Sequence, residues 1–425
     1  MEAIAVKKAI FLILLLPTLL RGKSLQSPVL PITQNFPISQ FGAKGDGVSD
    51  DSQAFIAAIA AASNAGATVT LADKTYLLTT TLRIRSTKSI AIVGGAHTML
   101  LFAPAHPLEN GFLIEDASGV QLKSFGISGS AAGIHCGINV DGSSNIHLDN
   151  LLIENINGVG TSTLSAIRLA GNEQIWITRS TFTNIGLGPG KAAAVIWNYY
   201  KTRTRHLYIE HNHIFGNSSD TAIALFDTDH VVVDDNVIDG GNNCFKPCVN
   251  NGYGILFYRT EVNSKFTADT PESLWPTPID ETITNNQVTN TAGSGIYLQG
   301  VHGAIVMKNT ITDAGLQMSP STLPVAGIAL NFSNNIKVLS NTIIRSRQVG
   351  IALATTKNVL IQANQIHDPS VCGVHLRVAQ IGTTIKNNVI DGAPIGLLSE
   401  RNPVSTIVKG NVLTRVRQST VGQMR

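Results

Sequence analysis

The chain repeats a short segment at a constant interval of 23 residues over its C-terminal part. The segment starts at Gly327, Gly350, Gly373 and Gly396, and an apolar residue follows each glycine. Repeats of this length are typical of stacked arrays, in which each repeat packs only against its neighbours. The interval therefore predicts one long solenoid domain rather than a globular fold with a single centre.

Apolar and variable residues alternate after each repeat start, which is typical of a strand with one buried face. We expect a first inward ladder at Ile167, Val195, Ile223, Ile255, Ile296, Ile328, Ile351, Val374 and Leu397, and a second at Leu169, Trp197, Leu225, Phe257, Leu298, Leu330, Leu353 and Leu376. Two further short apolar runs occur in each repeat, for example 336–338 and 342–344. Three short strands per repeat predict an all-β parallel β-helix.

An asparagine follows each regular repeat start by 14 or 15 residues. We predict that these asparagines occupy corners between strands, where they adopt a positive φ and bond the neighbouring coil. We assign them a structural role and no chemistry. They are Asn212, Asn236, Asn286, Asn309, Asn341, Asn364, Asn388 and Asn411.

The N-terminal part carries a dense motif at 41–55, FGAKGDGVSDDSQAF, followed by an alanine-rich segment. Asp50 or Asp51 is a suitable N-cap for a helix that Gly66 would end. The motif resembles the F-G-A-x-G-D-G-x-x-D-D opening of the pectate-lyase superfamily, which includes polygalacturonases, alginate epimerases and phage tailspikes. The resemblance implies a right-handed single-stranded parallel β-helix, closed by an N-terminal capping helix, in which Asp46, Asp50 and Asp51 are structural.

Within the first 24 residues, Lys7 and Lys8 precede a short apolar run, a pattern typical of a secretory signal peptide. An uncleaved anchor is the alternative. We therefore expect a secreted or periplasmic protein with one β-helix domain at 36–425, made of a cap and irregular coils (36–110) and regular coils (111–413). No later segment is long and apolar enough to span a membrane. The net charge of +3 is too small to indicate nucleic acid as a partner.

Four cysteines give no disulfide framework. Cys136 and Cys372 lie many coils apart, so we expect two buried thiols. Cys244 and Cys248 share one loop, where a local disulfide is favoured over a metal site because no further ligand accompanies them. We predict no metal-ligating set.

The repeat interval lengthens to 32, 41 and 32 residues in the central coils, which places insertions at 240–253, 258–280 and 313–326. Insertions in a solenoid map to loops on one face, so these would wall a groove for a ligand. Aromatic and amide side chains suit a sugar, and carboxylates or an arginine can supply acid–base chemistry. We predict Asn198, Tyr258, Tyr297, Gln299, His302 and Asn331 as substrate-binding residues, and Asp220, Asp227, Arg259 and Glu261 as catalytic residues.

Two short segments resemble motifs of the same superfamily. Residues 220–225 are similar to the D-D-C-I-A-I strand of polygalacturonases, although one aspartate is present and the N-T-D, S-H-G and R-I-K motifs are absent. Residues 251–258 share a Tyr-Gly pair with the Y-G-F-D-P-H strand of mannuronan epimerases but lack its Asp, Pro and His. Pectate lyases of this superfamily use Ca²⁺, a basic residue and several aspartates, which Asp227, Asp229 and Arg259 could supply.

The resemblance implies an exported, pectin lyase-like enzyme of polysaccharide degradation, either a polygalacturonase-like glycosidase or a polysaccharide lyase. Its substrate would be a pectin-like or other glycan that contains uronic acids, and Ca²⁺ would be its cofactor if it is a lyase. Two alternatives are a uronate epimerase and a non-catalytic glycan-binding or surface β-helix protein. The chain would work as a monomer or a homotrimer.

Overall fold

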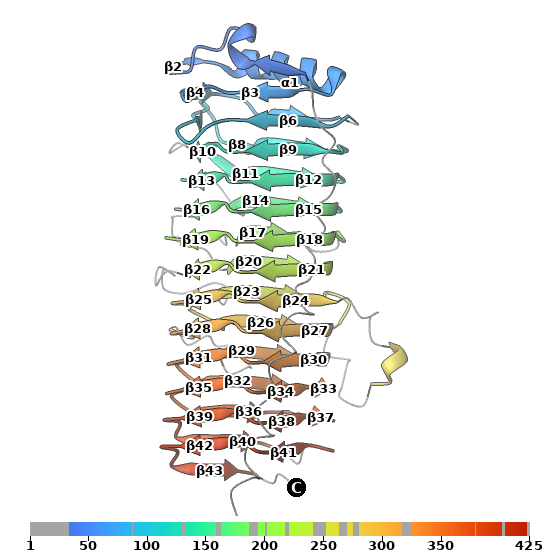
Figure 1. Cartoon of the computed structure of the whole chain (residues 1–425), viewed down its shortest axis with the longest axis vertical. Coiled ribbons are helices and arrows are strands. Elements are labelled where there is room, and N and C mark those ends of the chain that lie inside the picture. The colour runs from blue at the N-terminus through green and yellow to red at the C-terminus, as the bar shows by residue number, and fades with distance from the viewer. Residues whose placement is uncertain are drawn as a thin grey trace, which may run out of the picture. The chain divides into compact units, whose positions relative to one another are not determined.

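The structure is a computed structural model that describes residues 34–86, 88–129, 133–158, 163–186, 194–199, 202–216, 221–240, 252–262, 270–274, 280–316, 325–378, 380–401 and 404–422. The expected signal peptide (1–24) and the cysteine pair Cys244 and Cys248 lie outside these residues. Ile32–Arg425 forms a compact unit built almost wholly from short strands stacked in coils (Figure 1). This is the predicted parallel β-helix.

Sheet A is the first of three parallel sheets, and each of its strands pairs with its counterparts in the neighbouring coils. Its strands are, in order, β1 (Asn35–Pro37), β3 (Thr68–Thr70), β6 (Ile90–Val93), β9 (Val120–Lys123), β12 (Ser144–Asp149), β15 (Glu173–Thr178), β18 (Arg205–Glu210), β21 (Asp229–Asp234), β24 (Glu281–Thr284), β27 (His302–Met307), β30 (Asn334–Leu339), β34 (Leu360–Gln362), β38 (Thr384–Lys386) and β41 (Ile407–Lys409). Two short strands, β33 (Thr356–Lys357) and β37 (Gln380–Ile381), extend its edge.

Sheet B follows sheet A in each coil. Its strands are β2 (Asp46–Asp50), β4 (Thr75–Leu78), β7 (Met99–Phe102), β10 (Gly126–Gly129), β13 (Leu152–Glu154), β16 (Thr181–Thr183), β19 (His213–Phe215), β22 (Val237–Asp239), β25 (Gln287–Thr289), β28 (Thr310–Thr312), β31 (Thr342–Ile344), β35 (Gln365–His367), β39 (Val389–Asp391) and β42 (Val412–Thr414).

Sheet C contains the strands that begin the sequence repeats. They are β5 (Leu82–Ile84), β8 (Leu108–Glu115), β11 (Ile134–Asp141), β14 (Ser165–Ala170), β17 (Ala194–Asn198), β20 (Thr221–Phe226), β23 (Tyr253–Tyr258), β26 (Ile296–Gln299), β29 (Ala326–Asn331), β32 (Val349–Ala354), β36 (Cys372–Leu376), β40 (Ile395–Ser399) and β43 (Gln418–Val421).

One α-helix, α1 (Ser52–Ala65), and the 3₁₀ helix η1 (Ile38–Phe41) lie at the first coil, and a second 3₁₀ helix, η2 (Glu272–Leu274), lies between β23 and β24. Helix α1 buries Phe55, Ala58 and Ile59 against the interior of the β-helix. It therefore closes the N-terminal end, as expected.

The aspartates of the opening motif hold the chain before α1. The carboxylate of Asp51 accepts hydrogen bonds from the backbone N–H groups of Lys44 and Gly45, at 2.7 and 3.0 Å. Asp51 occupies the N-cap position but its side chain does not cap the helix. The predicted N-cap position is therefore confirmed for Asp51, although the preceding loop engages both of its oxygens. Asp50 instead accepts the N–H of Ser52 in the first turn.

The interior is a stack of aliphatic ladders. Ile328, Ile351 and Val374 lie in register on β29, β32 and β36 and are fully buried, as predicted. The prediction failed in one coil, because Ile196 rather than Val195 pairs with Ile167 and Ile223. Side chains alternate between the two faces of a strand, so this shift by one residue turns Trp197 outward and places Asn198 in the second inward ladder.

The predicted asparagine ladder is present. Nδ2 of Asn212 donates to Oδ1 of Asn236 at 3.0 Å, and the same bond links each later pair as far as Asn411. The expected positive φ was wrong, since it belongs to the residue just before each ladder asparagine: His211, Asp235, Asn285, Lys308, Ser340, Ala363, Asn387 and Gly410. That residue makes the corner, and the asparagine supplies the bonds between coils.

Cys136 and Cys372 are buried free thiols, as expected. Burial raises the pKa of the Cys136 thiol to about 11 and that of Cys372 to about 12. Within the described ranges, the helices are too short or too polar to cross a membrane.

Candidate functional site

Aromatic side chains gather on the outer face of sheet C, over consecutive coils from β17 to β26. They are Trp197, Tyr199, Phe226, Tyr253, Tyr258 and Tyr297, and we call them the aromatic face. Their rings are in contact: Trp197 with Tyr199 at 5.1 Å between centroids, Phe226 with Tyr258 at 5.5 Å, and Tyr253 with Tyr297 at 4.9 Å. The outward register of these strands brings them together, since Phe226 pairs with Tyr258 on the next strand.

Two amide side chains adjoin this face. The hydroxyl of Tyr297 donates to Oε1 of Gln299 at 2.6 Å and accepts from Nδ2 of Asn331 at 3.3 Å. Gln299 lies in register with Tyr258 on one side and Asn331 on the other. Burial raises the pKa of Tyr297 to about 12, so its hydroxyl keeps its proton. Four predicted substrate-binding residues, Tyr258, Tyr297, Gln299 and Asn331, thus form one patch.

An arginine extends the aromatic face toward the N-terminus. The guanidinium of Arg168, on β14, lies over the ring of Trp197 at 5.5 Å and donates to Oε1 of Glu109 at 2.8 Å. Sequence analysis missed this pair because it placed Trp197 in the inward ladder, whereas the register of β17 turns Trp197 outward.

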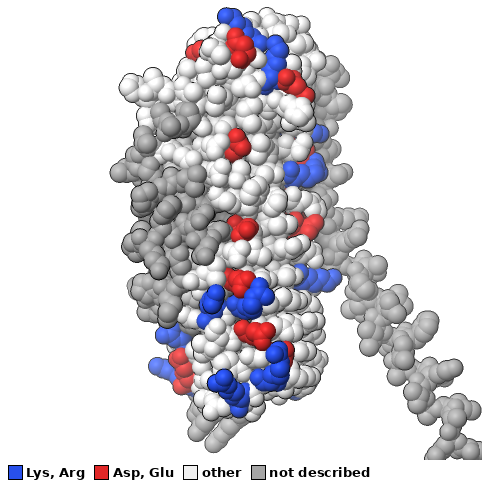
Figure 2. Space-filling view, turned by 90° about the vertical axis from the view of Figure 1, so that its left-hand side faces the viewer, with Lys and Arg blue, Asp and Glu red and all other residues white. Residues whose placement is uncertain are grey.

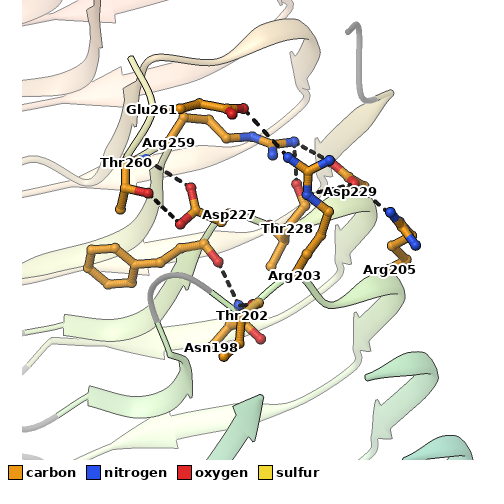
Figure 3. A network of polar contacts seen from close by, with 11 residues as sticks. Asn198, Thr202, Arg203, Arg205, Asp227, Thr228, Asp229, Arg259, Thr260 and Glu261 are labelled. Atoms are coloured by element: carbon orange, nitrogen blue, oxygen red, sulfur yellow. Dashed lines mark hydrogen bonds and ion pairs between the residues drawn. The ribbon is translucent and has the colours of Figure 1, made fainter. Parts of the chain in front are cut away.

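Charged residues gather where the strands of the aromatic face end, because Asp227 directly follows Phe226 and Arg259 directly follows Tyr258. We call this group the charged corner; it consists of Arg203, Arg205, Asp227, Asp229, Arg259, Thr260 and Glu261 (Figure 3). Three of the four predicted catalytic residues, Asp227, Arg259 and Glu261, are therefore brought together. The fourth, Asp220, lies outside the described residues.

Hydrogen bonds and ion pairs connect the corner. Asp227 accepts the N–H of Thr260 at 2.8 Å with one oxygen and its hydroxyl at 2.6 Å with the other. Arg203 lies 3.6 Å from Glu261 and 3.4 Å from Asp229, and Arg205 lies 3.5 Å from the same oxygen of Asp229. Both oxygens of Asp227 are thus engaged by the neighbouring coil.

Arg259, one of the predicted catalytic residues, does not lie at the surface. Its side chain is 2% exposed, and it donates to Asp229 and, at 2.6 Å, to the carbonyl oxygen of Thr228. A buried guanidinium needs a partner charge, and Asp229 supplies it. Arg259 therefore organises the corner from inside.

Glu281 is a member of this group that sequence analysis missed. It begins β24, points into the β-helix and is fully buried beside Arg259 and Asp229. Burial raises its pKa well above the ordinary value, with Asp229 adding to the shift and Arg259 opposing it. The sequence does indicate the inward position of Glu281, because Glu281 lies two residues before the inward Ile283 on the same strand.

Two predicted substrate-binding residues point inward instead. Asn198 is fully buried, and its Nδ2 donates to the carbonyl oxygens of Thr202 and Phe226. His302 begins β27 in register with Asn334, is buried, and has Nε2 2.9 Å from the side-chain amide of Asn335. The expected outward position was wrong for both, because they share the face of the core ladders.

The acidic residues of the corner do not fit Ca²⁺. Thr260 engages both oxygens of Asp227, and three arginines surround Asp229. In the described part of the chain, no three His, Cys, Asp or Glu residues gather as metal ligands. A cation at this position would meet guanidinium groups rather than oxygen ligands.

Charges on another side of the molecule gather mainly over the first and the last coils (Figure 2). In the C-terminal coils they form pairs, such as Arg345 with Asp313 at 2.7 Å and Arg415 with Asp368 at 3.3 Å. Positive and negative groups alternate, so this side resembles an ordinary solvated surface.

Coil pattern and stacked ladders define a protein of the pectin lyase-like β-helix class. The family described as "Right handed beta helix region" matches residues 110–272 and 279–415. The chain belongs to this right-handed β-helix family. No curated protein sequence matches it.

Several solved structures are similar in fold. The A-module of a mannuronan C-5 epimerase from Azotobacter vinelandii has a TM-score of 0.63 at 16% identity, over 89% of this chain and 99% of that one. The surface adhesin PfbA of Streptococcus pneumoniae has a TM-score of 0.55 at 14% identity, over 91% and 93%. The catalytic unit of an α-1,3-glucanase from Streptomyces thermodiastaticus has 0.51 at 17%, over 93% and 71%. The fold is thus shared by polysaccharide-active enzymes and an adhesin.

Proposed function

We propose that this protein is an exported enzyme that binds a uronic-acid-containing polysaccharide along the aromatic face and cleaves it by hydrolysis or β-elimination. The observation that carries the proposal is the patch of Tyr258, Tyr297, Gln299 and Asn331 beside the charged corner. Aromatic rings supply apolar contact area and amides supply paired donors and acceptors, which together suit a sugar ring.

The charged corner supports an acidic sugar. Arg203 and Arg205 are about half exposed, and their contacts with Asp229 are long at 3.4 and 3.5 Å. Exposed ion pairs of this kind are weak. A substrate carboxylate can therefore compete for these guanidinium groups, which bind carboxylates well.

Two of the similar structures support a polysaccharide as the ligand, since one is named as an epimerase of mannuronan and another as an α-1,3-glucanase. The signal-like sequence at 1–24 and the likeness to a surface adhesin support export. An epimerase acting on uronates could use the same face, so the test below also measures epimerisation.

A second candidate function is glycan binding without catalysis. It is favoured by the engagement of both oxygens of Asp227 by Thr260 and by the burial of Arg259. In this case the aromatic face would hold a glycan, and the corner would only stabilise the coil.

The test uses the purified full chain with polygalacturonate, polymannuronate and a neutral α-1,3-glucan as probes, each with added Ca²⁺ and with a chelator. Reducing ends report hydrolysis, ultraviolet absorbance reports unsaturated uronates, and proton exchange at C5 reports epimerisation. Binding without any of the three reactions would support the second candidate, and absence of binding to all probes would contradict both.

Two variants test whether the glycan binds on the aromatic face. Tyr258→Ala should weaken binding about tenfold or more, because the ring supplies much of the apolar contact. Phe215→Ala is the matched control, since Phe215 is a partly exposed aromatic residue on sheet B. Equal binding by both variants would place the ligand elsewhere.

A further inference from the structure

A second polar group lies on the same outer face of sheet C, three coils beyond Tyr297. Tyr297 pairs with Ala329, Ala329 with Ala352, and Ala352 with His375. With a strand spacing of about 4.8 Å, His375 lies about 14 Å from Tyr297 along the coils. The two alanines leave short side chains between the larger residues at each end.

His375 makes a close contact with an acid. Its Nε2 lies 3.0 Å from Oε1 of Glu400, which directly follows β40, at ion-pair distance but without a hydrogen bond. Its Nδ1 is buried and has no hydrogen-bond partner in the described part of the chain. An unpartnered buried polar atom costs free energy, so a group that pairs with Nδ1 of His375 would be stabilised there.

The surroundings keep the imidazole neutral. Burial lowers the pKa of His375, Glu400 opposes this shift, and Arg377 adds to it. Its outward neighbours on β32 and β40 are Ala352 and Leu398, which carry no charge. Cys372, on the same strand, has its pKa raised to about 12 and stays protonated. A neutral imidazole at neutral pH can accept a proton.

An arginine completes the group. Nε of Arg377 lies 3.7 Å from Oε1 of Glu400, and the side chains of Arg377 and Glu400 are 31% and 45% exposed. Both therefore reach solvent beside the buried ring. A guanidinium in this position can bind the carboxylate of an incoming uronate.

We propose that His375, Arg377 and Glu400 form the proton-transfer site of a β-elimination on a polyuronate, an inference that rests on the proposed function. Arg377 binds the sugar carboxylate, and Nδ1 of His375 removes the proton from C5. The electron pair of that C–H bond forms the C4–C5 double bond, the C4–O4 bond breaks, and water protonates the leaving oxygen. Glu400 is a positioning residue that stabilises the imidazolium.

Elimination fits this group better than hydrolysis. Hydrolysis of a glycosidic bond typically needs two carboxyl groups, one on each side of the scissile bond. On the outward positions of β29, β32, β36 and β40 and the residues that directly follow them, Glu400 is the one acid among the described residues. Elimination instead needs one base and a cation near the carboxylate, which His375 and Arg377 provide.

The experiment follows unsaturated product from polygalacturonate and polymannuronate with the full-length chain and its variants. We expect His375→Gln to lower kcat about 100-fold or more, and Arg377→Lys to act mainly on KM. Glu400→Gln should shift the acidic limb of the kcat/KM profile to lower pH, because Glu400 raises the pKa of His375. The matched control is His367→Gln, since His367 lies 3.8 Å from Asp391 but on sheet B.

Each outcome decides the proposal. Wild-type elimination that is lost in His375→Gln and kept in His367→Gln, with equal melting temperatures, supports it. Wild-type elimination that His375→Gln retains, with an unshifted pH profile, overturns this site and leaves the proposed function intact. Hydrolysis or epimerisation without unsaturated product also overturns it while an enzyme function stands. Failure of the wild type to react with any probe overturns both.

Discussion

The side chain of Asn341 joins three consecutive coils: its Nδ2 donates to Oδ1 of Asn364 in the next coil and to the carbonyl oxygen of Val306 in the previous one, both at 2.9 Å. Oδ1 of Asn364 also accepts the backbone N–H of Asn341, at 2.9 Å. Each asparagine thus satisfies buried polar groups that the parallel sheets leave at their corners.

Asn364→Ala should lower the free energy of unfolding by about 3 kcal/mol or more, because it leaves buried groups of both neighbouring coils unpaired. Glycan binding per folded molecule should stay unchanged. Urea denaturation measures the first quantity, and Gln365→Ala, which removes an exposed side chain on β35, is the control. A selective loss of binding would contradict the structural role of the ladder.

Ile351→Asp should prevent folding, since it places an unpaired charge inside the ladder of Ile328, Ile351 and Val374. Domains of this kind are stable by only about 5 to 15 kcal/mol. The same change at Ile407, which is 53% exposed in the last described coil, should be tolerated. Circular dichroism of the two proteins decides the register, and an Ile351 variant that melts like wild type would refute it.

Arg259→Ala should destabilise the protein by about 3 kcal/mol or more, because it leaves Asp229 and Glu281 without their buried cation. Arg345→Ala removes an exposed arginine that also bonds an aspartate, Asp313, and should cost less than about 1 kcal/mol. Thermal unfolding compares the two. Equal melting temperatures would mean that the buried pair adds nothing to stability.

Glu281→Gln should raise stability at neutral pH and have little effect below the ordinary glutamate pKa of 4.5. Because burial raises the folded-state pKa, the unfolded state loses its proton first as the pH rises. Stability is therefore lost between pH 4.5 and the folded-state pKa, and glutamine removes this loss. The measurement is the difference in unfolding free energy between variant and wild type at pH 4 and pH 8; a constant difference would contradict a raised pKa.

The stacked part of the fold could be predicted because each repeat has the same alternation of apolar and variable residues. Ile328, Ile351 and Val374 share a spacing and a face, and the register follows from that alone. In the coil of β17 no glycine marks the start, so the sequence pattern predicts the wrong faces for Trp197 and Asn198. Because side chains on a strand alternate between its two faces, an error of one residue assigns each side chain to the opposite face.

The candidate site could be predicted only in part. The outward pattern located Tyr258, Tyr297, Gln299 and Asn331 because they continue the regular coils. The direction of the Arg259 side chain depends on Asp229, which lies 30 residues away in the neighbouring coil. The pattern of residues along one strand contains no information about such a partner. Glu281 is a charge at an inward position, whereas the predicted site residues were those expected on the outer face.

Helix α1 covers the first coil, whereas Ile407, Val408 and Val412 in the last described coil are exposed. In an array held together by contacts between neighbours, a coil with exposed apolar residues opens more readily than one whose core is covered. Local unfolding should therefore begin at β43 and proceed coil by coil toward β2. Each coil that opens would break one bond of the asparagine ladder, and amide hydrogen exchange would slow progressively toward the helix-covered end.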